Sequence, residues 1–101
     1  METLDVTLVR IYLTEGERQL DPLLKKLHDV EIVRGVTVFR GVSGFGKSGR
    51  YHSSHLLDLS SDLPLVVEFF DAPDKINTIL AHLEGEFESG HIAYWSAKVN
   101  I

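Results

Sequence analysis

The sequence contains no cysteine among its 101 residues, and this absence excludes disulfides, thiolate catalysis and zinc–cysteine sites. No apolar run approaches the roughly 18 residues that a membrane-spanning helix requires, and the opening METLDVTLVR lacks the basic-then-apolar pattern of a secretory signal. The net charge of −5 is too small, and the hydrophobic content of 44% too high, for a disordered chain. We therefore expect one folded cytoplasmic domain over residues 1–101, without direct membrane insertion.

Acidic residues are absent between Glu31 and Asp58. Four of the ten basic residues lie in this stretch: Arg34, Arg40, Lys47 and Arg50. An acidic protein with one basic segment is poorly suited to nucleic acid, which needs a broad basic face. A small phosphate-bearing anion fits the segment better, and an ordinary solvated loop is the alternative.

Hydrophobic patterning predicts four strands and two helices. The strands cover residues 6–13, 36–42, 63–70 and 91–99, where β-branched and aromatic residues gather. Two stripes with helical spacing separate them: Leu20, Leu23, Leu24 and Leu27, and Ile76, Ile79, Leu80, Leu83 and Phe87. Asp21 as the capping residue and Pro22 in the first turn favour the start of the first helix there, or two or three residues earlier, and the segment 71–74 opens the second.

The resulting order, βαββαβ, predicts an α+β fold of the ferredoxin-like class, with a four-stranded antiparallel sheet and two helices on one face. Five of the eight glycines fall between residues 35 and 49, so we expect a long flexible loop over about 43–61. The alternation of strands then assigns one set of side chains to the helices and another to the opposite face. The set assigned to the opposite face is Val6, Leu8, Arg10, Tyr12, Val36, Val38, Arg40, Val42, Val66, Glu68, Phe70, Ala93, Trp95, Ala97 and Val99.

Such an apolar face is too large to stay exposed on a monomer. Only Arg10, Arg40 and Glu68 interrupt it. Tyr94 and Trp95 could stack on a base, but strands favour aromatic residues for packing, which is the simpler explanation. We expect other copies of the chain to cover this face, with the few charges paired across or beside the interface.

Residues 41–48, GVSGFGKS, match the phosphate-loop pattern G-x-x-x-x-G-K-[ST]. Glycines allow successive backbone amides to close on a phosphate, and Lys47 would neutralise it. A phosphate-loop hydrolase is disfavoured, because the following GRYHSSHLLDLSSDLP has no long apolar helical stripe. A glycine-rich loop that contacts phosphate in another fold agrees with the sequence.

A metal site is the alternative for the same region. His52, His55 and Asp58 are spaced so that a short helix would place them on about one face, where they could bind a divalent transition metal. The surrounding serines favour caps and turns in a solvated loop. No nucleophile–base set or carboxylate pair stands out, so we expect no enzymatic activity.

The order βαββαβ, the apolar sheet face and the segment RGVSGFGKSG resemble the PII-like superfamily of trimeric signalling proteins. Nearly the whole chain resembles the uncharacterised PII-like family known as domain of unknown function 190. In PII proteins the loop between the second and third strands begins with a GFG-Arg-like motif, which Gly44-Phe45-Gly46-Lys47 matches with lysine for arginine. The resemblance implies a homotrimer that binds adenine nucleotides in the clefts between subunits.

The chain departs from the PII pattern in two places. Gly90-His91 stands where PII proteins have Gly-Lys, so this cation is weaker and titrates near neutral pH. The C-terminal arginines of PII proteins have no counterpart here. The implied ligand is therefore AMP, ADP, ATP, a cyclic dinucleotide or a related phosphate anion. The residues expected to bind it are Arg40, Gly41, Ser43, Gly44, Phe45, Gly46, Lys47, Gly90 and His91.

The sequence thus predicts a non-enzymatic PII-like regulatory trimer whose long loop acts on a partner protein of unknown identity. The first alternative is a metal-binding or metal-tolerance trimer, because a related ferredoxin-like family is linked to copper tolerance. The second is a structural oligomer without a ligand.

Overall fold

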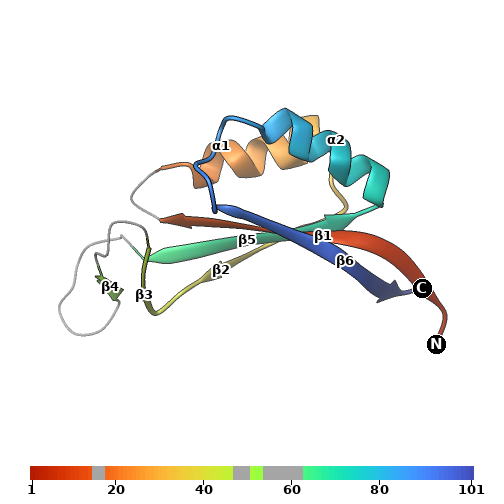
Figure 1. The fold of residues 1–101 in the computed structure, drawn as a ribbon, viewed down its shortest axis with the longest axis horizontal. Helices are drawn as coiled ribbons and strands as arrows, with labels where there is room; N and C mark the ends of the chain where they lie inside the picture. The colour runs from red at the N-terminus through yellow and green to blue at the C-terminus, as the bar shows by residue number, and fades with distance from the viewer. Residues whose placement is uncertain (15–17, 47–50, 54–62) are drawn as a thin grey trace.

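A four-stranded antiparallel sheet carries the helices on one face (Figure 1). The computed structural model describes residues 1–14, 18–46, 51–53 and 63–101. The four strands are β1 (Thr3–Thr14), β2 (Val36–Arg40), β5 (Pro64–Asp71) and β6 (Ile92–Asn100), in the spatial order β2-β5-β1-β6. Together with α1 (Leu20–Lys25) and α2 (Pro73–Leu83), they confirm the predicted ferredoxin-like fold.

The first helix begins slightly earlier than Asp21 and ends in an unusual way. Gln19 is its N-cap and makes no side-chain capping bond, so the predicted cap by Asp21 is wrong and this residue lies in the first turn. The helix continues as a π-helical segment, η2 (Lys26–Val30). Ile32 follows in the left-handed region, with φ of 54°.

The core lies between the sheet and the helices. The stripes predicted for the two helices supply its outer layer, and alternate residues of β1 and β5 supply the inner one. Phe87 lies beyond the end of α2 but still packs on this core. The buried cluster consists of Val9, Ile11, Leu13, Leu23, Leu27, Leu65, Val67, Phe69, Ile76, Ile79 and Leu83.

The strand register corrects one assignment made from the sequence. Val38 lies opposite Val67, and Val36 lies opposite Phe69, both of which are buried beneath the helices. Directly opposed residues point to the same side of a sheet, so Val36, Val38 and Arg40 belong to the helix side. The prediction for β2 was therefore wrong by one residue, whereas the assignments for β1, β5 and β6 agree with the register.

The side of the sheet away from the helices is apolar and half exposed, and we call it the open face. Tyr12, Phe39 and Trp95 are 42%, 47% and 44% exposed there. Its members, from the register of the four strands, are Leu4, Val6, Leu8, Arg10, Tyr12, Thr37, Phe39, Val66, Glu68, Phe70, Ala93, Trp95, Ala97 and Val99. Among the described strand residues on this face, only Arg10 and Glu68 are charged.

Part of the predicted loop forms a small antiparallel ribbon. Strand β3 (Ser43–Phe45) pairs with β4 (Tyr51–Ser53), with Gly44 opposite His52. The expectation of an unstructured loop from residue 43 is therefore wrong at these two strands, while residues 47–50 and 54–62 lie outside the described part of the chain.

Asp71 joins the start of α2 to the segment before β2. Its carboxylate accepts hydrogen bonds from the backbone amides of Ala72 and Arg34 and forms an ion pair with Lys75. Burial alone would raise the pKa of Asp71, but these hydrogen bonds and the ammonium of Lys75 outweigh it and lower the pKa below its ordinary 3.8. Lys75 also donates to the backbone oxygen of Ile32, which anchors the left-handed residue to α2.

In the part of the chain that the structure describes, no helix is long and apolar enough to cross a membrane.

Candidate anion-binding site

Those residues expected to bind an anion that the structure describes lie at or just beyond one end of the sheet, where β1 and β2 finish and β5 and β6 begin (Figure 1). Arg40 is the last residue of β2 and lies opposite Leu65. Gly41 follows and donates its backbone N–H to the carbonyl oxygen of Pro64, with an N···O distance of 2.7 Å. This bond fixes the point at which the chain leaves the sheet and enters the predicted phosphate loop.

Gly41 is required for this approach. A Cβ at this position would lie 2.7 Å from Cγ of Pro64 and 3.3 Å from its backbone oxygen, and the first distance is shorter than real contacts allow. The glycine therefore has a packing role, which the sequence motif alone did not reveal.

Gly44 and Gly46 do not form the anion nest that the motif predicts. Gly44 lies in β3, and neither residue has a positive φ; within the described chain only Gly85 and Gly90 do among the glycines. A nest needs alternating backbone conformations that turn successive amides toward one point. A phosphate at this loop would instead depend on side-chain charge or on a different loop conformation.

The ribbon places Ser43 and Phe45 at the outer edge of this region. Phe45 is 64% exposed, and the preceding Val42 is 75% exposed. Lys47, the cation of the motif, lies outside the described residues, so its predicted role stays a prediction.

Gly90 and His91 form the second half of the predicted site. Gly90 has φ of 86°, which a glycine adopts without strain, and His91 follows immediately before β6. Nδ1 of His91 lies 2.9 Å from the carbonyl oxygen of Tyr12, and the backbone N–H of Tyr12 donates to the carbonyl oxygen of His91. A carbonyl oxygen only accepts, so Nδ1 carries a proton and Nε2 is the ring nitrogen left for a ligand.

The two halves lie on opposite edges of the same sheet. Arg40 and Gly41 end the edge strand β2, whereas His91 precedes the edge strand β6, with β5 and β1 between them. Three strand spacings separate these edges, about 14 Å at roughly 4.8 Å each. One phosphate group cannot contact both edges within one chain.

The side chains of the alternative metal site, His52, His55 and Asp58, lie outside the described part of the structure. His55 and Asp58 lie outside the described residues, and only the backbone of His52 is described. Within the described part of the chain, no three histidine, aspartate or glutamate side chains form a group able to hold a metal ion.

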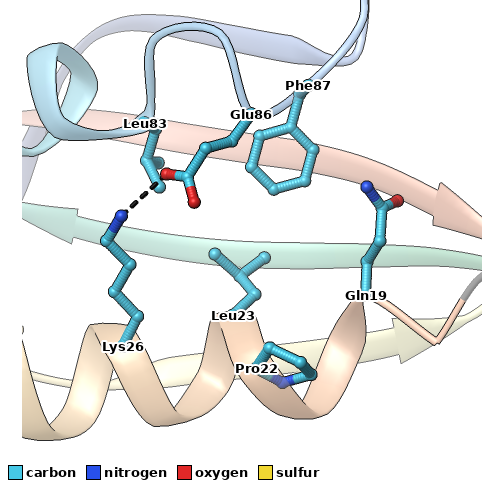
Figure 2. Close-up of a pocket in the computed structure, with 7 residues that line it drawn as sticks. All are labelled: Gln19, Pro22, Leu23, Lys26, Leu83, Glu86 and Phe87. Carbon is cyan, nitrogen blue, oxygen red and sulfur yellow. Dashed lines mark hydrogen bonds and ion pairs between the residues drawn. The ribbon is translucent and has the colours of Figure 1, made fainter.

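A pocket that the sequence did not reveal lies on the helix side, between α1 and the segment after α2 (Figure 2). Lys26 donates to Glu86 across its mouth with an N···O distance of 2.7 Å, so its charge is already neutralised. The volume of about 130 Å³ is small beside the several hundred that nucleotide-sized ligands occupy. Its lining is Gln19, Pro22, Leu23, Lys26, Leu83, Glu86 and Phe87.

A partly buried contact joins η2 to α2. The carboxylate of Glu31 is only 4% exposed and lies 2.6 Å from Nδ1 of His82 on α2. Glu31 and His82 are 51 residues apart in the chain, so the spacing of residues in the sequence does not predict this contact. The pair connects the end of η2 to α2 and includes none of the predicted anion-binding residues.

Comparison with known proteins assigns the chain to a family. The family DUF190, described as "Uncharacterized ACR, COG1993", matches residues 6–99. This chain belongs to DUF190. Among its relatives, a UPF0166 protein of Aquifex aeolicus is 34% identical over 92 residues, which cover 91% of this chain and 94% of that protein. UPF0166 protein MJ1524 of Methanocaldococcus jannaschii is 32% identical over 81 residues, covering 75% and 73% of the two chains.

Solved structures with the same fold are PII-like proteins. CPII from Thiomonas intermedia K12, in a structure with ADP and bicarbonate, superposes with a TM-score of 0.71 at 20% identity, covering 99% of this DUF190 chain and 93% of CPII. A putative PII-like signaling protein from Thermus thermophilus superposes with a TM-score of 0.64 at 17% identity, covering 98% and 91%. At these identities the likeness shows the fold, and the predicted PII-like fold is confirmed.

Proposed function

We propose that this chain is a PII-like regulatory protein that forms a homotrimer and binds an adenine nucleotide, or a related phosphate anion, between its subunits. It acts through the loop after β2 on a partner protein rather than as an enzyme, and residues 1–101 form one such domain. The observation that carries the proposal is the division of the predicted site between the two edges of the sheet.

A cleft between two copies of the chain can bring the two halves of the predicted site together. Because β2 and β6 are both edge strands, the Arg40 edge of one copy can approach the His91 edge of the next in a closed ring. The open face supports the same arrangement, because its apolar side chains leave water when copies associate. The binding of ADP by CPII, which has the same fold, supports the choice of nucleotide.

Each half of the cleft would contribute a different interaction. Arg40 and Lys47 supply positive charge, and an arginine can donate two parallel hydrogen bonds to one phosphate. His91 offers Nε2, which accepts a hydrogen bond when the ring is neutral and donates one when it is protonated. The neutral form suits a ribose hydroxyl or an adenine amine, whereas the charged form suits a phosphate.

Calorimetric titration with AMP, ADP, ATP and a cyclic dinucleotide tests the proposal, with copper and zinc as separate titrants for the metal alternative. Lys47→Ala and Arg40→Ala should each weaken the preferred nucleotide roughly ten- to a hundredfold, the loss expected for one charge-assisted contact of about 1.5–3 kcal/mol.

The matched control is Lys98→Ala. Lys98 pairs with Asp5 at the opposite end of the sheet, so removing its charge should leave the affinity unchanged. Nucleotide titrations that stay flat for the wild-type protein would overturn the proposal. If Lys47→Ala and Arg40→Ala both bind like Lys98→Ala, the ligand lies elsewhere.

A further inference from the structure

An ion pair lies within the open face, where the neighbouring side chains are apolar apart from the hydroxyls of Thr37 and Tyr12. Arg10 on β1 and Glu68 on β5 are directly opposite in the register, and Nε of Arg10 lies 2.8 Å from Oε1 of Glu68. The guanidinium also lies 5.9 Å from the ring centroid of Trp95 on β6, within cation–π range. Neighbouring cross-strand pairs on the same face are apolar: Leu8 with Phe70, and Tyr12 with Val66.

Arg10 keeps its positive charge beside Glu68. The hydrogen bond from Arg10 to Glu68 raises the pKa of Arg10 above its ordinary value, against a smaller opposing effect of desolvation. The two charges cancel, so the described open face carries no surplus positive charge. A polyanion such as RNA needs that surplus, and the whole chain carries −5. A second copy of this chain, with the same neutral and apolar face, is the occupant that the charges favour.

Burial beneath a second copy changes the contribution of the Arg10–Glu68 pair to stability. In the single chain the Arg10 and Glu68 side chains are 40% and 23% exposed, and such exposed pairs contribute little to stability. Beneath another copy both charges lose water, and an arrangement that lays only apolar side chains over them is strongly disfavoured. An arrangement that brings polar groups of the neighbouring copies, including their own pairs, to this point avoids that loss.

We propose that the Arg10–Glu68 pair is the specificity element of the open face, which fixes the register and number in which copies associate while the apolar side chains drive association. This inference rests on the trimer proposed above and deepens it. A related use of single buried polar residues to fix register is well attested in coiled coils.

The test uses the full chain and three variants. Glu68→Gln and Arg10→Met each leave one charge without its partner, whereas Arg10→Met/Glu68→Leu replaces both by apolar side chains of similar size. Lys98→Met is the control, since it removes the cation of an exposed ion pair on the helix side of the sheet. Circular dichroism and cooperative unfolding confirm that each variant folds.

Association is measured by sedimentation velocity and by dilution series of tryptophan emission. Trp95 is the only tryptophan of the chain and lies on the open face, so its emission reports directly on whether that face is covered. Each single variant should raise the dissociation midpoint by at least about thirtyfold, as for truncating one partner of a buried charge pair. The double variant should associate as tightly as the wild type or more tightly, but as a mixture of sizes.

The outcomes separate this inference from the proposed trimer. A wild-type monomer overturns both. A wild-type trimer whose single and double variants assemble with unchanged affinity and one size overturns the specificity role alone. Binding of a labelled single-stranded RNA that competes with association at physiological salt would also overturn it, because the face would then serve another occupant.

Discussion

Replacing Gly41 by alanine should destabilise the protein through one identifiable collision. The added methyl would lie 2.7 Å from Cγ of Pro64 and 3.3 Å from the backbone oxygen to which Gly41 donates. Neither atom can move freely, because Pro64 has a rigid ring and its backbone, in β5, is paired with Thr14 of β1. Inserting a methyl into such a contact costs about 1–3 kcal/mol.

Gly35→Ala is the matched comparison. Nothing lies within 4 Å of a Cβ at Gly35, and its φ is not positive, so the variant should gain about 0.4–1 kcal/mol from the reduced freedom of the unfolded chain. Urea unfolding measures the free energy of unfolding of both variants. The protein concentration is kept fixed, since the stability of an oligomer depends on concentration. A Gly41→Ala variant as stable as Gly35→Ala would refute the reasoning, whereas a gap of about 1.4–4 kcal/mol would support it.

Three further predictions concern single residues. Asp71→Asn should be less stable than the wild type at neutral pH. Because the native pKa of Asp71 is lowered, the difference in free energy of unfolding between the two proteins should shrink as the pH falls below 3.8. A difference that stays constant into acid would contradict this. Ile32→Asn should raise the free energy of unfolding by about 1 kcal/mol in thermal unfolding, since a β-branched residue is strained at φ of 54° and this side chain is 61% exposed. Val30→Asn in η2 is the control and should bring no such gain. A lower Tm for Ile32→Asn would count against strain at this position. His91→Ala should weaken ADP binding, because it removes the ring nitrogen Nε2 that the contact between Nδ1 and the Tyr12 carbonyl leaves for a ligand, and an unchanged affinity in calorimetric titration would exclude such a contact.

The fold was predictable because its signals are local. The leucine stripe from Leu20 and the isoleucine stripe from Ile76 mark the helices, and β-branched runs mark the strands. The side to which β2 points was not predictable, because Val36, Thr37, Val38 and Phe39 can serve either face. Only the pairing of Val38 with Val67 decides it.

The candidate site was less predictable than the fold. The motif correctly directed attention to the chain after Arg40, but it suggested a nest at Gly44 that the strand β3 replaces. The packing role of Gly41 depends on Pro64, which is distant in sequence. The separation of Arg40 from His91 depends on the strand order, which the motif does not contain. The register also pairs Arg10 with Glu68 within one chain, whereas the sequence predicted only that the charges of this face pair across or beside an interface between copies.

Native mass spectrometry of the wild-type protein with ADP tests the central claim most directly, because one spectrum reports both the number of chains and the number of nucleotides bound. We expect a particle of three 11.4 kDa chains that carries ADP at sites between them and loses the bound nucleotide when it dissociates. A monomer that retains ADP would contradict the cleft between subunits. A trimer that never retains any of the tested nucleotides would contradict the proposed ligand.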